Sequence, residues 1–212
     1  MGSLIDSYDI VVRMNLSCPI PKRLRKDIGS RTDVLYHVLI RAAHTRHNSE
    51  LFPKHTREQI HTWKNDGVQW VISKLSLSDP RVREFANVIN GIIPWVTLPV
   101  KSYKFLNSSV GGPPNMGTIA MYHLLQAPIK ELTVIGCDFH MNGYYTGYGG
   151  FTKKQAELGA GGGSMWGQNY ANENVRRVHK LDGQLRFLRQ LHRTDPRFNP
   201  DEVLLSVLED TE

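Results

Sequence analysis

One stretch near the middle of the chain constrains its fold more than any other. Residues 111–114 read as a Gly-Gly-Pro-Pro loop, 116–125 are apolar at helical spacing, and 130–135 form a short strand pattern that ends at Gly136. A loop, a helix and a buried strand in this order are typical of an α/β domain with a mostly parallel sheet. We therefore expect a Rossmann-like, mostly parallel sheet flanked by helices.

Further patterns along the chain support this class. Strands are expected where β-branched and apolar residues cluster, and helices where a capping residue precedes a periodic pattern. The predicted strands cover 9–15, 33–40 and 68–73. The predicted helices cover 56–65, 78–88 and the apolar stripe from Val178 to Leu191, before a short final element over 201–208. Two segments are expected to be irregular, namely the basic run 22–26 and residues 91–111, the latter with one helical turn.

Composition narrows the class of protein. The chain has 212 residues, of which 40% are hydrophobic and 22% charged, and these values predict one globular domain rather than a disordered chain, a collagen or a coiled coil. Two cysteines are too few for a disulfide framework or a structural zinc site. No membrane span is expected, because no apolar run is long enough. No signal peptide is expected, because the N-terminal residues show no basic region followed by an apolar core. The net charge of +6 suits anionic partners of many kinds.

A glycine-rich segment interrupts the second half. Residues 143–167 hold nine of the chain's 18 glycines, a density that disfavours core packing and predicts a mobile loop. A long loop inside a compact domain is usually functional, often as a lid, and a disordered insertion is the alternative.

Several polar residues are candidates for chemistry. Arg13, Asn15 and Asp138 are expected at the carboxyl ends of strands, where parallel sheets bind ligands. His179 is expected to open the C-terminal helix, with Asp182 placed to orient its imidazole. A histidine so placed can act as a general base, although a solvated helical residue is the alternative. Phosphate-loop, nucleophile-elbow and zinc-protease motifs are absent, and the Asp138-Phe139-His140 sequence is a weak metal pattern.

Two segments together resemble sialyltransferases of glycosyltransferase family 29. Residues 2–32 contain GSLIDSYDIVVRMN and DIGSRT, which is similar to the family's large motif, an I-D-x-x-D-x-V-x-R-x-N run followed by D-x-G-x-R-T. Pro114–Thr118, with TVIGCDF downstream, is similar to the small motif. Tyr144-Tyr145 stands where the family has a short aromatic motif, and His179 stands where its very small motif has the histidine.

The resemblance implies a GT-A-like sialyltransferase variant that transfers sialic acid or a related acidic sugar from a CMP-sugar to an acceptor hydroxyl. Transfer would be inverting and would use no metal and no cofactor, so the implied partners are a nucleotide-sugar donor and a glycan-like acceptor. His179 would be the general base. The implied donor contacts are Asn15 on the nucleotide, Asn115, Gly117 and Thr118 near the cytidine or phosphate, and Tyr144 and Tyr145 on the phosphate. The charge of Arg13 or of the Lys22–Lys26 patch suits the sugar carboxylate, although solvated surface is the favoured interpretation of the patch.

This sequence departs from the family pattern in three ways. The large motif begins upstream with a strand and a Gly-Asn turn, so a single domain over 1–212 would lack its first strand. Gly183 and Gln184 stand where the very small motif has its glutamate. Cys18 and Cys137 do not match the family's paired cysteines, which suits the reducing cytoplasm of a bacterial or viral relative. The Golgi lumen is the alternative for a fragment of a membrane-anchored enzyme.

Two other functions stay open at this level. The missing strand motivates a truncated, non-catalytic module that binds a nucleotide or a protein. Residues 176–197 carry seven basic and two acidic side chains, which motivates nucleic-acid binding. The chain has no recognised nucleic-acid motif, so a solvated helix face is the favoured interpretation of that segment.

Overall fold

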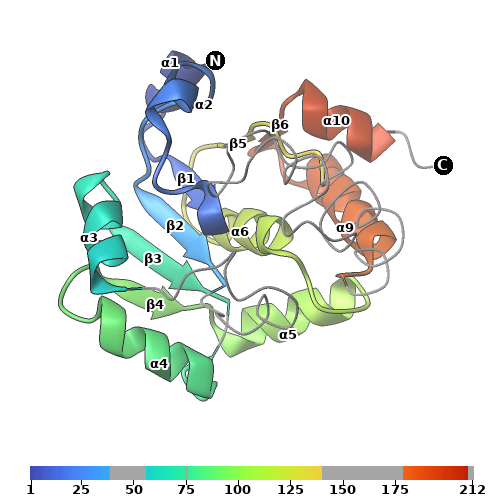
Figure 1. Cartoon of the computed structure of the whole chain (residues 1–212). Coiled ribbons are helices and arrows are strands. Elements are labelled where there is room, and N and C mark those ends of the chain that lie inside the picture. Colours follow the sequence, from blue (N-terminus) through green and yellow to red (C-terminus); the bar gives the residue numbers. More distant parts are fainter. Residues whose placement is uncertain (39–55, 75, 140–178, 210–212) are drawn as a thin grey trace, which may run out of the picture. The chain divides into compact units, whose positions relative to one another are not determined.

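The computed structural model describes residues 1–38, 56–74, 76–139 and 179–209 (Figure 1). These residues form two compact units, the first within residues 1–99 and the second within residues 100–212. The prediction that the whole chain is one domain stays a prediction. The glycine-rich segment predicted over 143–167 lies outside the described residues.

The first unit is built on a four-stranded parallel sheet. Its strands, in the order in which they pair, are β1 (Val12–Met14), β2 (Val34–His37), β3 (Trp70–Ser73) and β4 (Trp95–Thr97). Val34 lies opposite Val12 on one side and Trp70 on the other, and every pairing is parallel. The carboxyl ends of the four strands therefore meet at one edge of the sheet. This arrangement confirms the predicted Rossmann-like α/β class.

Two helices supply the core of this sheet. Helices α3 (Arg57–Asn65) and α4 (Pro80–Ile89) lie beside the sheet (Figure 1). Trp63 of α3 and Phe85 of α4 have ring centroids 6.4 Å apart and pack with Leu35 and Val71 of the sheet. Leu35 and Val71 are opposite each other in register, so both point to the helix-covered face. The predicted cap of α3 is confirmed, because the Thr56 hydroxyl accepts a hydrogen bond from the Gln59 N–H at 3.2 Å.

The second unit combines four helices with a two-stranded parallel sheet among its described residues. In chain order they are α5 (Val100–Ser109), α6 (Met116–Leu125), β5 (Leu132–Val134), α9 (Leu181–Thr194), β6 (Phe198–Pro200) and α10 (Glu202–Glu209). Leu132 of β5 lies opposite Phe198 of β6. Apolar side chains of α6, α9 and α10 form the core, namely Met121, Leu125, Leu181, Leu185, Leu188, Leu204 and Leu208. The predicted helix 116–125 and the predicted final element are confirmed.

The predictions of irregular structure for residues 22–26 and 91–111 were wrong. Residues 22–26 fall in the helical turns η2 (Lys22–Leu24) and α2 (Arg25–Ile28), and 91–111 contain β4 and the ten-residue helix α5. Short turns carry no period that a sequence pattern can reveal. Helix α5 buries only Leu106 among its own residues, so no apolar stripe announces it. No sequence pattern predicted three further elements, namely strand β6, the helical turn η1 (Asn15–Ser17) and the short helix α1 (Gly2–Asp6).

Within the described parts of the chain, none of the helices has the length and apolar character that a membrane span requires.

Candidate functional site

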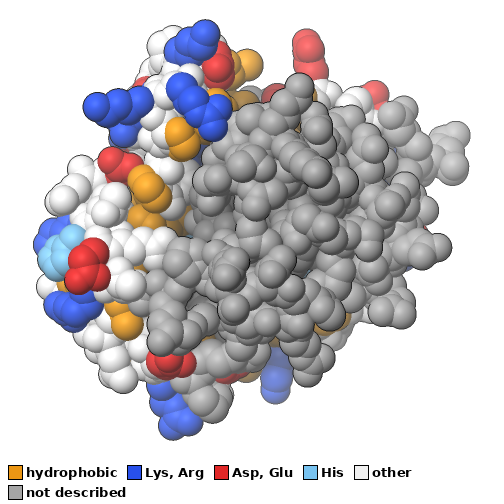
Figure 2. Space-filling view, viewed as in Figure 1, with side chains coloured by type: hydrophobic (Ala, Val, Ile, Leu, Met, Phe, Trp, Pro, Cys, Tyr) orange, Lys and Arg blue, Asp and Glu red, His pale blue; other side chains and the backbone are white. Residues whose placement is uncertain are grey.

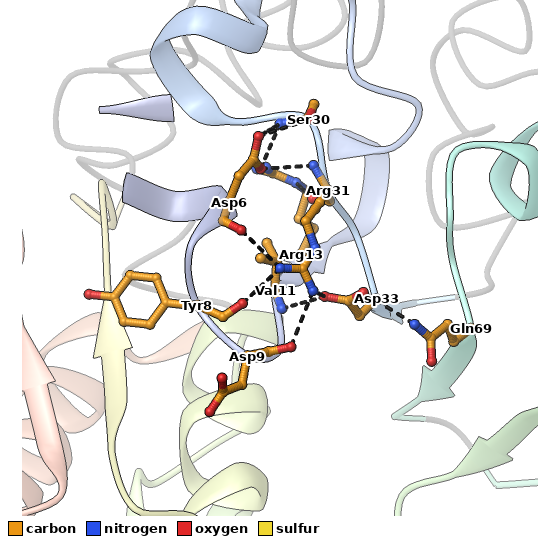
Figure 3. A network of polar contacts seen from close by, with 9 residues as sticks. All are labelled: Asp6, Tyr8, Asp9, Val11, Arg13, Ser30, Arg31, Asp33 and Gln69. Atoms are coloured by element: carbon orange, nitrogen blue, oxygen red, sulfur yellow. Dashed lines mark hydrogen bonds and ion pairs between the residues drawn. The ribbon is translucent and has the colours of Figure 1, made fainter. Parts of the chain in front are cut away.

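The polar residues of the N-terminal segment that carry the resemblance form a clamp (Figure 3). The two carboxylate oxygens of Asp6 accept hydrogen bonds from the Ser30 N–H at 2.8 and 2.9 Å. They also accept from the Ser30 hydroxyl at 2.8 Å and the Arg31 N–H at 3.0 Å. Burial alone would raise the pKa of Asp6, but these hydrogen bonds outweigh it and hold the pKa below its ordinary value. One carboxylate thus ties the end of α1 to the turn after α2.

Arg31 completes the clamp from the opposite side (Figure 3). Its guanidinium donates to the backbone carbonyls of Asp6 at 2.9 Å, Tyr8 at 2.8 Å and Asp9 at 3.1 Å. It also forms an ion pair with the Asp33 carboxylate at 3.0 Å. That one cation therefore fixes the path of the chain from α1 into β1.

Arg13 lies in β1 and holds the same turn. Its Nε donates to the carbonyl of Arg31 at 2.9 Å and its Nη2 donates to the carbonyl of Ile28 at 2.6 Å. Gly29 between them has a φ of +79°, and a Cβ there would lie 2.6 Å from the Asp6 Oδ1. These contacts give Arg13 a structural role, and its contact with a donor carboxylate stays a prediction.

Asn15 occupies the carboxyl edge of the sheet, as its position after β1 predicted. Its φ is +51°, and its Oδ1 accepts a hydrogen bond at 3.1 Å from the Val38 N–H, which follows β2. Its side-chain NH₂ is the group that can donate to a ligand at this edge.

A row of polar residues at the same edge was missed from the sequence. His37 ends β2, Ser73 ends β3 and lies opposite it, and Thr97 ends β4 opposite Ser73. His37 and Ser73 are buried, and burial lowers the pKa of the adjacent Lys74 to about 8. The available signal was their shared place at strand ends, which becomes visible only once the register is known.

In the second unit, the loop before α6 forms an ordered helix N-terminus. Asn115 caps the helix, since its Oδ1 accepts from the Thr118 N–H at 2.8 Å. The N–H groups of Met116 and Gly117 occupy the first turn, where no partner exists inside the helix, and the helix dipole favours an anion there. The predicted contact residues Asn115, Gly117 and Thr118 therefore surround one anion-favouring terminus.

His179 lies beside this loop. Its Nδ1 is 3.0 Å from the carbonyl oxygen of Pro113. Because a carbonyl oxygen only accepts, Nδ1 carries the hydrogen and Nε2 is the basic nitrogen of the neutral ring. The prediction that His179 opens the C-terminal helix was wrong. Lys180 adopts a left-handed conformation with a φ of +49°, so α9 begins at Leu181 and His179 precedes it.

Gln184 in the first turn of α9 joins the loop and the histidine. It is fully buried, and its Oε1 accepts from the Asn115 N–H and the Thr118 hydroxyl, each at 2.8 Å. Its Nε2 donates to the His179 carbonyl at 2.6 Å. The structure thus brings together three predicted site residues, Asn115, Thr118 and His179, through a side chain that the sequence marked only as a departure.

Comparison with known proteins adds one finding. Residues 1–95 match the model of glycosyltransferase family 29 (sialyltransferase). The match contains the whole clamp and confirms the resemblance to this family over residues 1–95, called the family 29 segment below. The Pro114–Thr118 loop and His179 lie beyond it. No curated protein and no solved structure matches the chain.

The family 29 segment also carries the basic patch at Lys22–Lys26. Figure 2 shows Lys and Arg side chains gathered over α1 and α2, and Lys22, Arg23 and Lys26 are exposed. The clamp and the patch thus differ, because the clamp arginines bind groups within the chain whereas Lys22, Arg23 and Lys26 are exposed.

Outside the family 29 segment, two arginines of the basic C-terminal region bind within the chain. The Arg189 Nε donates to the carbonyl of Leu208, and Arg197 forms an ion pair with Asp195 at 2.7 Å. Arg197 also donates to the Leu125 carbonyl at 2.8 Å, which fixes the end of α6. These contacts account for part of the positive charge by structure rather than by nucleic-acid binding.

The other residues singled out from the sequence are two tyrosines, one histidine and two cysteines. Tyr144, Tyr145 and His140 lie outside the described residues. Cys18 and Cys137 are free thiols, and burial raises the pKa of each to about 12.

Proposed function

We propose that this chain transfers an acidic sugar such as sialic acid from a CMP-sugar to an acceptor hydroxyl, with inversion and without a metal ion. The observation that carries the proposal is the family 29 match over residues 1–95. The position of His179 beside the N-terminus of α6 supports the proposal, because it offers a base next to an anion-favouring helix end.

In this proposal, each unit offers one feature that binds part of a donor. Asn15 donates its side-chain NH₂ to the nucleotide at the carboxyl edge of the sheet. The first-turn N–H groups of α6, at Met116 and Gly117, stabilise the phosphate of the CMP leaving group. Fixed donors of this kind stabilise charge that develops as the bond to the phosphate breaks. Tyr144 and Tyr145 add hydrogen bonds to the same phosphate.

The acceptor is activated by His179. The acceptor hydroxyl gives its proton to Nε2, and its oxygen forms a bond to the anomeric carbon of the sugar. The bond from that carbon to the phosphate oxygen breaks on the opposite face, and CMP leaves with the electron pair. The Pro113 carbonyl accepts from Nδ1, so the basic nitrogen of the neutral ring is Nε2, and the same hydrogen bond stabilises the imidazolium that forms.

CMP release tests the proposal. The chain would be incubated with CMP-sialic acid and a panel of glycan acceptors, with and without EDTA. Release that needs an acceptor and survives EDTA is expected. His179→Ala should lower the rate about a hundredfold or more, as expected for loss of a general base, while CMP affinity stays within a few-fold. His61→Ala, which changes an exposed histidine of α3, is the matched control. Full activity of His179→Ala would overturn the base assignment.

A second candidate is a non-catalytic module that binds a nucleotide or a protein. Two apolar side chains close in sequence to β1 favour it, since Leu4 is 51% and Ile10 is 59% exposed. Such exposure is common at surfaces that bind partners. CMP binding without turnover on any acceptor would support this candidate over the transferase.

A further inference from the structure

Gln184 lies at the centre of a closed set of hydrogen bonds. Its Oε1 binds the Asn115 N–H and the Thr118 hydroxyl, and its Nε2 binds the His179 carbonyl. The Pro113 carbonyl, two residues before Asn115, binds the His179 ring. His179 is therefore held twice, through its ring and through its backbone, and both restraints lead back to the same loop.

The identity of the side chain at this position is tightly constrained. Its surroundings offer two donors and one acceptor, which matches an amide with one oxygen and one NH₂ group. The orientation of the amide is unambiguous, because the Asn115 N–H can only donate and the His179 carbonyl can only accept. Gln184 has none of its surface exposed, so an unmatched polar atom there would have no water to bind.

A carboxylate would satisfy only part of this set. One oxygen could accept from Asn115 and Thr118, but the other would face the His179 carbonyl oxygen, which it repels unless it carries a proton. A glutamate at 184 would thus keep the restraint on the α6 N-terminus and lose the restraint on His179 when ionised. Burial among backbone groups would raise its pKa, because the charged form loses hydration.

We infer that Gln184 is a positioning residue whose amide couples the N-terminus of α6 to His179, and whose neutrality keeps that coupling independent of pH. This inference rests on the proposed function only in so far as His179 is taken as the base. It assigns two separable tasks to one side chain. The oxygen orders the donor loop, and the NH₂ group orders the base.

Gln184→Glu separates the two tasks. CMP affinity should stay within about threefold of the wild type, because the bonds to the loop remain. Above the ordinary imidazole pKa of about 6.5, kcat should fall about tenfold or more, since a misplaced catalytic group loses rate steeply. Gln190→Glu makes the same chemical change at an exposed position of α9 and should leave kcat and CMP affinity unchanged.

A second measurement does not depend on activity. Long-range ¹H–¹⁵N NMR of the histidine rings, with His179 assigned by its loss in His179→Ala, reports the tautomer directly. The wild type should hold neutral His179 with the hydrogen on Nδ1. Gln184→Glu should shift the ring towards a mixture of both tautomers as pH rises, and Gln190→Glu should not.

The outcomes distinguish the inference from the proposed function. An unchanged tautomer and an unchanged kcat profile in Gln184→Glu would overturn the inference, even if the chain is an active transferase. A tautomer shift in a chain that shows no transfer would support the inference and overturn the transferase proposal. Should Gln184→Glu fail to fold, Thr118→Val removes one bond to the Gln184 oxygen. It should weaken CMP binding more than it changes the His179 tautomer, with Thr118→Ser restoring the affinity, and the reverse result would contradict the inference.

Discussion

Removal of the Asp6 carboxylate should destabilise the first unit without touching a proposed ligand contact. In Asp6→Ala, the Ser30 N–H, the Ser30 hydroxyl and the Arg31 N–H lose a charged acceptor at 2.8 to 3.0 Å. Each such bond contributes on the order of 1 to 3 kcal/mol when well buried, and Asp6 is only half-buried. We therefore expect a loss of about 3 kcal/mol in the free energy of unfolding, less than the sum of the three.

Urea unfolding followed by tryptophan fluorescence measures this loss, because Trp63, Trp70 and Trp95 all lie in the first unit. Asp9→Ala is the matched control, since Asp9 is exposed and contributes its backbone carbonyl to the clamp. The pKa of Asp6 is lowered in the folded state, so its contribution is present above its unfolded pKa of about 3.9 and is lost as pH falls through the folded pKa. A loss below about 1 kcal/mol at neutral pH, or an equal loss in Asp9→Ala, would refute the clamp.

Two further predictions concern packing and charge. Gly183→Ala should cost about 3 kcal/mol or more despite the better helix propensity of alanine, because its Cβ would lie 2.0 Å from the Val110 carbonyl oxygen. Gly91→Ala, which meets no atom but has a φ of +78°, should cost only about 1 kcal/mol, and equal losses in urea unfolding would contradict this reasoning. Burial lowers the pKa of Lys74 to about 8, so the unfolded chain binds more protons from there to about pH 10.4 and stability should rise with pH in that window. Lys74→Met should abolish that rise, and a rise that persists would show that Lys74 is hydrated.

The sequence predicted the elements that carry a strong local signal. The Thr56 cap of α3, the apolar period of α6 and the strand patterns of β2 and β3 were all sufficient. Strand β4 and helix α5 were not predicted. The three residues of β4 are a strand only because β3 pairs with them, and a helix that buries only Leu106 shows no apolar stripe in its sequence. Elements defined by long-range pairing leave little trace in local pattern.

Only part of the candidate site could likewise be predicted from the sequence. The motif spacing named Asn15, Asn115, Thr118 and His179 as candidates, and their contact with a substrate stays a prediction. It did not show that Arg13 binds backbone carbonyls, because spacing alone does not tell a structural cation from a ligand contact. The role of Gln184 was also hidden, since its partners Asn115 and Thr118 lie 69 and 66 residues away in the chain.

Calorimetric titration with CMP tests the central claim most directly. The whole 212-residue chain would be titrated with CMP, UMP and GDP, each with and without EDTA. The proposed donor site predicts binding that is selective for CMP and unchanged by EDTA. Absence of binding, or equal affinity for the three nucleotides, would contradict a CMP-sugar transferase.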